Sequence, residues 1–202
     1  MWKHRSIRRL FWRVCVLASL VLAGCSTTTS QSFNVVKDSA VEKSYIATDA
    51  DFGKYRQLLS KDMGIHFPTN APHSEEEILR IRQIFRTAFL AELDGYAIVT
   101  EPGPNTLAVE ASLIDMRFGT SSDVPDLRGN LSQLAQPGQL LFLMELRDSE
   151  TDRVLGRAAD SSGDPPQFAT PETNATDWEG VELAARRWAG LFRQFLDKNL
   201  NK

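Results

Sequence analysis

Three carboxylates at the ends of expected strands are the side chains best placed for general acid–base chemistry. They are Asp115, Glu145 and Asp148, and paired carboxylates would suit a hydrolase. Asp148, however, precedes a turn, where an aspartate commonly accepts hydrogen bonds from backbone amides. The chain contains no Gly-x-Ser-x-Gly elbow and no phosphate-binding loop. We therefore expect no catalytic residue, and a hydrolase using these acids is an alternative hypothesis.

Two histidines, His66 and His73, are the remaining side chains that could hold a metal ion. Pro68 and Pro72 lie between them, and the spacing of the histidines fits no zinc motif. We expect both to be exposed loop histidines. The sequence thus predicts no metal site and no cofactor.

Trp178 and Trp188 lie in one expected helix and could form an aromatic shelf for a ligand. Ten residues at about 100° each place the two rings about 80° apart around the helix, so they do not share one stripe. We expect Trp188 to pack in the core and Trp178 to pack at the first helical turn.

The N-terminal segment has the composition of an export signal. Its first 13 residues include five basic side chains and no acid, and the apolar run Val14–Leu22 follows. A basic head, a short apolar stretch and small residues before a cut site are typical of a secretory signal. The run extends only about 15 Å as a helix, whereas a bilayer core of about 30 Å needs roughly twenty residues. Residues 1–24 are therefore expected to be removed.

The tetrapeptide Leu22-Ala23-Gly24-Cys25 resembles the bacterial lipobox. The resemblance implies a diacylglyceryl group on the Cys25 sulfur, cleavage after Gly24 and acylation of the new N-terminus. The residue after the cysteine is Ser26. In Gram-negative lipoproteins, a residue other than aspartate at this position usually directs the protein to the outer membrane. The sequence Arg8-Arg9-Leu10-Phe11 is similar to the core of a twin-arginine signal, but the strongly apolar run favours the Sec route.

Removal of this segment changes the charge balance. The full chain has 23 basic and 26 acidic residues, a net charge of −3, and removal of five basic residues leaves 18 against 26, or −8. Such a charge argues against nucleic-acid binding and against attraction to anionic lipids. We expect the acyl chains to hold the protein at the periplasmic face of the outer membrane.

The remaining chain is expected to form one domain behind a tether. At 42% hydrophobic and 24% charged residues, the composition is that of an ordinary globular protein. Residues 25–47 are polar and rich in Ser and Thr, which predicts a flexible tether. Residues 48–202 are expected to form the periplasmic domain.

Hydrophobic periodicity predicts the elements of this domain. Capping boxes at Ser74 with Glu77 and at Thr176 with Glu179 predict helices over 74–94 and 177–198. Alternating apolar residues predict strands over about 57–67, 96–100, 107–113, 139–148 and 153–160. The alternation changes phase at Ile114, which suggests a bulge or an exit from the sheet.

This element order predicts a two-layer α+β domain. We expect a mostly antiparallel sheet of about five strands with both helices on one face. Two long polar connections, 119–138 and 160–176, are the expected places for partner contacts. Their isolated apolar residues are the candidate contacts: Leu127, Leu131, Leu134 and Phe168.

Several short patterns occur along the chain in a recognisable order. They are Asp51-Phe52-Gly53-Lys54-Tyr55, Leu93-Asp94-Gly95-Tyr96, Leu113-Ile114-Asp115, Glu145-Leu146-Arg147-Asp148-Ser149 with Thr151, and Trp188-Ala189. Placed after the lipobox, they resemble the bacterial lipoprotein family known as domain of unknown function 3313. The resemblance implies a location and a fold, and it lends no catalytic residue to the chain.

The sequence therefore favours a non-catalytic binding or assembly module of the cell envelope. It would be attached to the membrane through its lipid anchor and would bind an envelope protein, but no nucleic acid. Two alternatives remain: a small-ligand or peptidoglycan-binding lipoprotein, and a periplasmic hydrolase using the strand-end carboxylates.

Overall fold

The structure is a computed structural model, which shows an α+β domain. It describes residues 31–69, 73–117, 134, 136–161, 163–170, 173 and 175–201. Its elements in chain order are β1 (Phe33–Val35), β2 (Lys43–Ala47), a 3₁₀ turn η1 (Phe52–Lys54), β3 (Gln57–Ser60), β4 (Gly64–His66), α1 (Glu75–Glu92), β5 (Ala97–Val99), β6 (Thr106–Asp115), β7 (Leu140–Asp148), β8 (Val154–Asp160) and α2 (Trp178–Leu200).

The sheet is mixed and has eight strands, so the prediction of about five mostly antiparallel strands was wrong. The strand order is β1-β2-β8-β7-β6-β3-β5, and β4 pairs with β6 beyond the end of β3. The strands on either side of α1 run parallel: β3 pairs with β5 and β6, and β4 pairs with β6. A helix between two strands returns the chain to the same end of the sheet, which makes the strands parallel.

Two strands lie within residues 25–47, the segment expected to be a tether. β2 pairs antiparallel with β8, opposite Gly156–Ala159, and β1 forms the edge beyond it. Ser44 and Ala47 of β2 are buried, as is Val41 just before it. The folded domain thus begins before residue 48.

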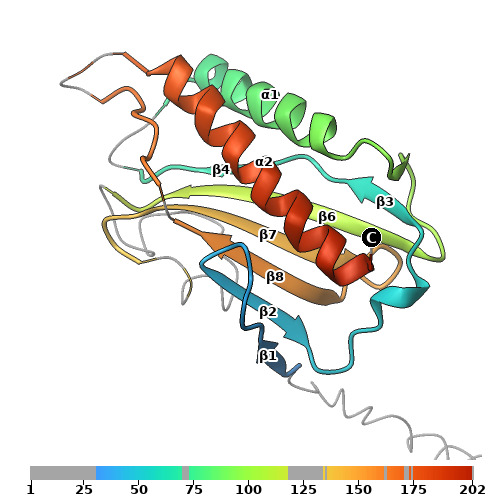
Figure 1. Cartoon of the computed structure of the whole chain (residues 1–202). Helices are drawn as coiled ribbons and strands as arrows, with labels where there is room; N and C mark the ends of the chain where they lie inside the picture. The colour runs from blue at the N-terminus through green and yellow to red at the C-terminus, as the bar shows by residue number, and fades with distance from the viewer. Residues whose placement is uncertain are drawn as a thin grey trace, which may run out of the picture. The chain divides into compact units, whose positions relative to one another are not determined.

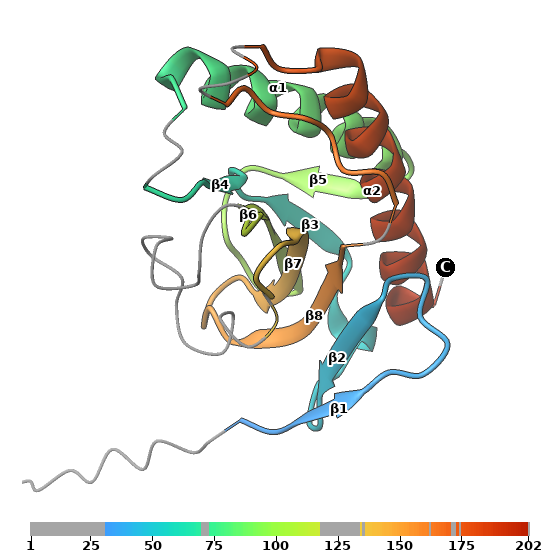
Figure 2. The ribbon, with the colours of Figure 1, turned by 90° about the vertical axis from the view of Figure 1, so that its left-hand side faces the viewer.

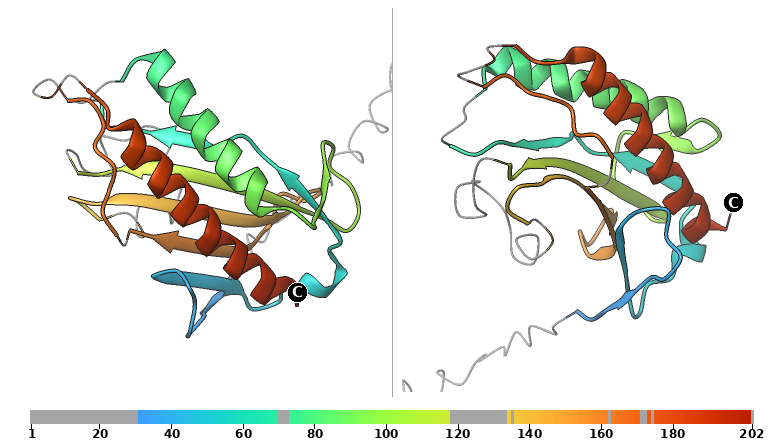
Figure 3. Two further views of the ribbon diagram at one scale, coloured as in Figure 1. Left: turned by 45° about the horizontal axis from the view of Figure 1, so that its top comes forward. Right: turned by 60° about the vertical axis from the view of Figure 1, so that its left-hand side comes forward.

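Both helices cover one face of the sheet (Figures 1 and 3). Figure 2 shows them on one side of the strands, with β1 and β2 at the end of the sheet farthest from α1. The Ser74 hydroxyl caps α1 by accepting a hydrogen bond from the backbone N–H of Glu77. The cap of α2 is Asp177, which accepts from Gly180, so the predicted Thr176 cap was wrong.

The main core lies between the helices and the sheet. Trp188 of α2 stacks on Phe142 of β7, with ring centroids 5.1 Å apart, and lies 5.8 Å from Phe85 of α1. Trp188 is only 2% exposed, which confirms the expected core position. Trp178 is partly buried, with the Arg80 guanidinium 3.9 Å from its ring centroid.

A second apolar cluster lies on the other face of the sheet and explains the change of phase at Ile114. Its members are Ile114, Met116, Leu134, Leu141, Leu143 and Ala159. Strand β6 continues to Asp115 in unbroken register with β7, so the apolar residues change parity because both faces are buried there. The irregularity in the ladder occurs instead between β7 and β8, at Leu146 and Arg147.

Candidate functional site

The three candidate acids do not converge. Asp115 pairs with Leu140 in the β6–β7 ladder, whereas Asp148 pairs with Leu107. This eight-residue offset corresponds to about 26 Å at about 3.3 Å per residue. Glu145 lies three residues before Asp148, so its side chain points to the opposite face of the sheet. No single cleft contains the three carboxylates.

Asp148 joins the η1 turn to the β7–β8 turn. Its carboxylate accepts hydrogen bonds from the Tyr55 hydroxyl at 2.7 Å, the Lys54 ammonium at 3.2 Å and the Thr151 backbone N–H at 3.0 Å. Burial disfavours its charge, but the bonds from Tyr55 and Thr151 outweigh this effect and lower the pKa of Asp148. Burial and the bond to Asp148 raise the pKa of Tyr55 to about 12.

Replacing Asp148 by asparagine is expected to lower the free energy of unfolding by about 1–2 kcal/mol at pH 7, because charge-assisted hydrogen bonds are lost. The folded-state pKa of Asp148 lies below the unfolded value of about 3.9. Its contribution is therefore complete above that value and is lost as the pH falls below it. Denaturant titrations at pH 7 and pH 3 measure the difference. Glu150→Gln is the control in the same turn, because this side chain is exposed, and an equal loss there would contradict the assignment.

Glu145 is held in an ion-pair cluster on the face away from the helices. One carboxylate oxygen accepts from Nε of Arg157 at 2.6 Å, and the other accepts from Arg147. Glu145 is buried, and it lies directly opposite Glu110 in the ladder. Arg147 also pairs with Glu110 at 3.2 Å. The carboxylate is thus engaged in cross-strand ion pairs.

Asp115 holds the connection before α2. It pairs with Arg117, whose Nε lies 3.0 Å from Oδ1, and Arg117 donates to the carbonyl of Pro166 at 2.9 Å. The Arg117 guanidinium also lies 5.3 Å from the ring centroid of Phe168. These contacts fix the chain around residues 166–168 against the end of β6.

The side chain of His73 is buried and His66 lies in β4 opposite Ile114, so neither histidine has the expected exposed loop position. The His73 side chain is 3% exposed, its Nδ1 lies 2.9 Å from Glu77, and its ring centroid lies 3.8 Å from that of Phe67. Glu77 also accepts a hydrogen bond from the Thr176 hydroxyl. Burial opposes the charge on Glu77, but the bonds from Thr176 and His73 lower its pKa.

The two helices are joined near their C-terminal ends by a second polar cluster. Arg193 donates to both oxygens of Asp197 at 2.8 Å, and to the carbonyls of Glu92 and Asp94 at the end of α1. The Tyr96 hydroxyl donates to Asp197 at 2.6 Å. Burial and this bond raise the pKa of Tyr96.

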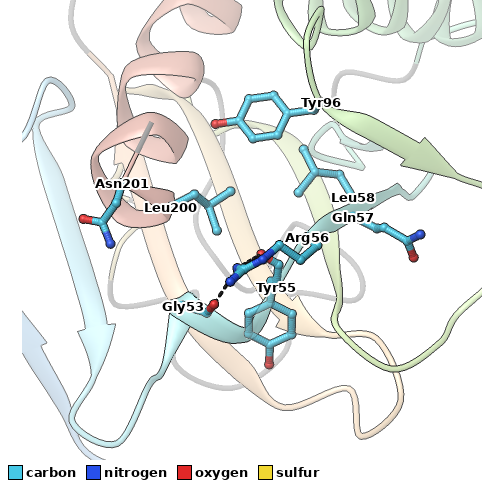
Figure 4. Close-up of a pocket in the computed structure, with 8 residues that line it drawn as sticks. All are labelled: Gly53, Tyr55, Arg56, Gln57, Leu58, Tyr96, Leu200 and Asn201. Carbon is cyan, nitrogen blue, oxygen red and sulfur yellow. Dashed lines mark hydrogen bonds between the residues drawn. The ribbon is translucent and has the colours of Figure 1, made fainter.

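A pocket of about 340 Å³ opens between η1, β3 and the end of α2. Figure 4 shows its eight lining residues, which are Gly53, Tyr55, Arg56, Gln57, Leu58, Tyr96, Leu200 and Asn201. Arg56 is their only formally charged side chain. The lining comes from three distant segments, so sequence patterns did not indicate this site.

The residues expected to contact a partner fall into two groups. Leu127 and Leu131 lie outside the described residues, as do Gly24 and Cys25. Leu134 packs in the second apolar cluster, and Phe168 packs 5.1 Å from Phe67 by ring centroids. Both are buried against their own chain, at 9% and 4% exposure.

Comparison with known proteins identifies the family. A model of the family described as "Protein of unknown function (DUF3313)" matches residues 30–192. The chain belongs to this family. The match confirms the resemblance stated from the sequence patterns, and it extends from the segment before β1 into α2.

The solved structures that resemble this DUF3313 chain have low sequence identity to it. A PelC dodecamer from Paraburkholderia phytofirmans is 9% identical, with a TM-score of 0.36, over 81% of this chain and 95% of that chain. A DUF4136 family protein from Bacteroides thetaiotaomicron VPI-5482 is 12% identical, with a TM-score of 0.40, over 83% and 97%. No functionally curated protein matches.

Two of the patterns that carry the DUF3313 resemblance meet in space. Lys54 and Tyr55 of the first pattern bind Asp148 of the Glu145–Ser149 pattern. Tyr96 of another pattern binds α2 through Asp197. These patterns therefore connect separate elements, and two of them contribute Gly53, Tyr55 and Tyr96 to the lining of the pocket.

Within the described ranges, no three His, Cys, Asp or Glu side chains form a group suited to a metal ion. Neither α1 nor α2 is long and apolar enough to cross a membrane, nor is any other helix among the described residues.

Proposed function

We propose that this DUF3313 chain is a lipid-anchored protein on the periplasmic face of the bacterial outer membrane, where it acts as a non-catalytic binding or assembly module. The observation that carries the proposal is Leu22-Ala23-Gly24-Cys25, placed after a basic head and a short apolar run. A thiol after small residues at this position is what lipoprotein processing requires.

The arrangement of polar groups supports a binding or assembly role. The carboxylates of Asp115, Glu145 and Asp148 are engaged by arginine, lysine or tyrosine side chains in separate parts of the fold. The Asp148 and Asp115 clusters join segments that are distant in sequence, and the Glu145 cluster joins the neighbouring strands β6, β7 and β8. The acids thus act as connections that hold a rigid module together.

A small-ligand-binding lipoprotein, including one that binds a peptidoglycan fragment, is the second candidate. The pocket of about 340 Å³ beside Arg56 favours it, because ligand sites commonly have volumes of about 300–1,000 Å³. The two candidates share the lipid anchor and differ in what the domain binds.

Membrane sorting tests the proposed location. When the full chain is produced in a Gram-negative bacterium, we expect it in the outer-membrane fraction, and we expect Ser26→Asp to shift it to the inner membrane. Ser26→Asn is the matched control and should remain with the outer membrane. Density-gradient separation followed by immunoblotting measures the distribution. Wild-type protein in the soluble periplasmic fraction would contradict the proposal.

A further inference from the structure

The pocket beside η1 presents one cation against apolar walls. Among its eight lining residues, Arg56 alone carries a formal charge, and none is acidic. Leu58 of β3 is buried behind the pocket, and the partly exposed Leu200 and Tyr96 ring supply its apolar surface. A single guanidinium in an otherwise neutral lining favours a ligand with one anionic group.

Arg56 is held in place by the backbone. Its Nη1 donates to the carbonyl oxygens of Gly53 and Tyr55, the latter at 2.9 Å (Figure 4). Among the described residues, no carboxylate forms an ion pair with Arg56, and no hydrogen bond engages its Nε or Nη2. These two nitrogens form the edge of a guanidinium that binds both oxygens of a carboxylate.

The walls of the pocket are fixed before any ligand arrives. Tyr55 is tied to the β7–β8 turn through Asp148 at 2.7 Å, and Tyr96 is tied to α2 through Asp197 at 2.6 Å. Asp197 in turn is held by Arg193. A site whose side chains are already ordered loses less conformational entropy when it binds a ligand.

We propose that this pocket binds a carboxylate attached to a small apolar group, with Arg56 pairing with the carboxylate and with Leu200 and the Tyr96 ring contacting the apolar group. This inference deepens the proposed binding function by naming a ligand class, and it does not depend on the lipid anchor. A planar carboxylate matches the one free edge of Arg56. Phosphate groups usually meet several donors, and this lining offers one cation.

The carboxylate could belong to a small metabolite or to the C-terminus of a peptide, which share the same chemistry. N-acetyl-leucine represents the first source, and a tetrapeptide ending in leucine represents the second. The neutral controls are N-acetyl-leucinamide and the C-terminally amidated tetrapeptide. Binding of both acids would indicate a site open enough for a chain end, and binding of N-acetyl-leucine alone would indicate a small-molecule site.

The test is calorimetric titration of the purified full chain in detergent with these probes and with inorganic phosphate. We expect at least one acid to bind about tenfold or more tightly than its amide. Arg56→Gln should weaken the binding of that acid by about tenfold or more. Arg56→Lys should weaken this binding less, because a lysine keeps the positive charge but lacks the planar pair of N–H donors.

The controls separate the pocket from general effects of charge. Arg153→Gln removes a cation that pairs with Asp49 outside the pocket and should leave binding unchanged. The Cys25→Ala chain should bind as the wild type does, so a failure of the anchor proposal would leave this result intact. A thermal unfolding curve shows whether Arg56→Gln remains folded, and the acid–amide comparison on the wild type does not depend on that variant.

Four results would overturn the proposal. The first is equal binding of the acids and the amides, and the second is unchanged binding by a folded Arg56→Gln variant. The third is a dissociation constant weaker than about 10 mM for both acids. Phosphate binding more tightly than both acids would also contradict it, because it would indicate a phosphate site.

Discussion

Replacing Trp188 by alanine is expected to lower the free energy of unfolding by about 3–5 kcal/mol, the usual cost of removing a large buried aromatic side chain. The indole is 2% exposed and stacks on Phe142, with Phe85 on another side. It therefore joins both helices to the centre of the sheet. The substitution leaves a cavity where α1, α2 and β7 meet. Denaturant titration of the full chain followed by circular dichroism measures the loss.

Trp178→Ala is the matched control for this prediction. Trp178 lies in the same helix, but it is only partly buried and packs beneath Arg80 near the helix start. We expect a loss of about 1–2 kcal/mol there, from partial burial and a cation–π contact. Equal losses for the two variants would contradict the assignment of Trp188 to the centre of the core.

Replacing Cys25 by alanine is expected to abolish acyl labelling and to move the chain from the membrane to the soluble fraction. Each buried CH₂ of an acyl chain contributes about 0.8 kcal/mol, so several chains give stable anchoring. With 18 basic and 26 acidic residues after residue 24, the rest of the chain is repelled by anionic lipids. Metabolic labelling with an alkyne-bearing palmitate, combined with fractionation, measures both effects.

Cys15→Ala is the corresponding control, because it removes the other cysteine of the chain. Cys15 lies in the segment expected to be removed, so this variant should be labelled and should stay in the membrane fraction. Persistent labelling of the Cys25→Ala chain would show that the acyl group is attached elsewhere.

The long elements were predicted from the sequence because each carries several repeats of its own periodicity. Helix α1 has a capping serine and a buried stripe of Ile81, Phe85 and Phe89. Strand β7 alternates strictly on its helix-facing side, through Leu140, Phe142, Met144 and Leu146. In such segments local pattern and tertiary packing agree.

The short strands were predicted only in part. β5 lies within the strand expected over 96–100, but the single strand expected over 57–67 is divided into β3 and β4, and β1, with three residues, is too short to show an alternation. β2 has the sequence KSYIA and follows a polar segment, so only its pairing with β8 defines it. The parallel pairs also depend on where α1 returns the chain, which no local pattern records.

The candidate site was less predictable than the fold. The carboxylates were visible as residue types, but two of their connections are distant in sequence. Asp148 binds Lys54 and Tyr55, 94 and 93 residues away, and Arg117 links Asp115 to Pro166. His73 follows a proline-rich segment and resembles a loop residue, yet it is buried because Glu77 lies one helical turn later and Phe67 stacks on its ring. The Arg56 pocket requires residues 53, 55–58, 96 and 200–201 to meet, and only the assembled fold brings them together.

The most direct test of the lipid anchor is intact mass spectrometry of the full-length gene product purified from bacterial membranes. We expect a polypeptide that begins at Cys25 and is heavier than its sequence by one diacylglyceryl group and one N-linked acyl chain. Peptide fragmentation should place both groups on Cys25. A protein that retains residues 1–24, or an unmodified chain that begins elsewhere, would contradict the account.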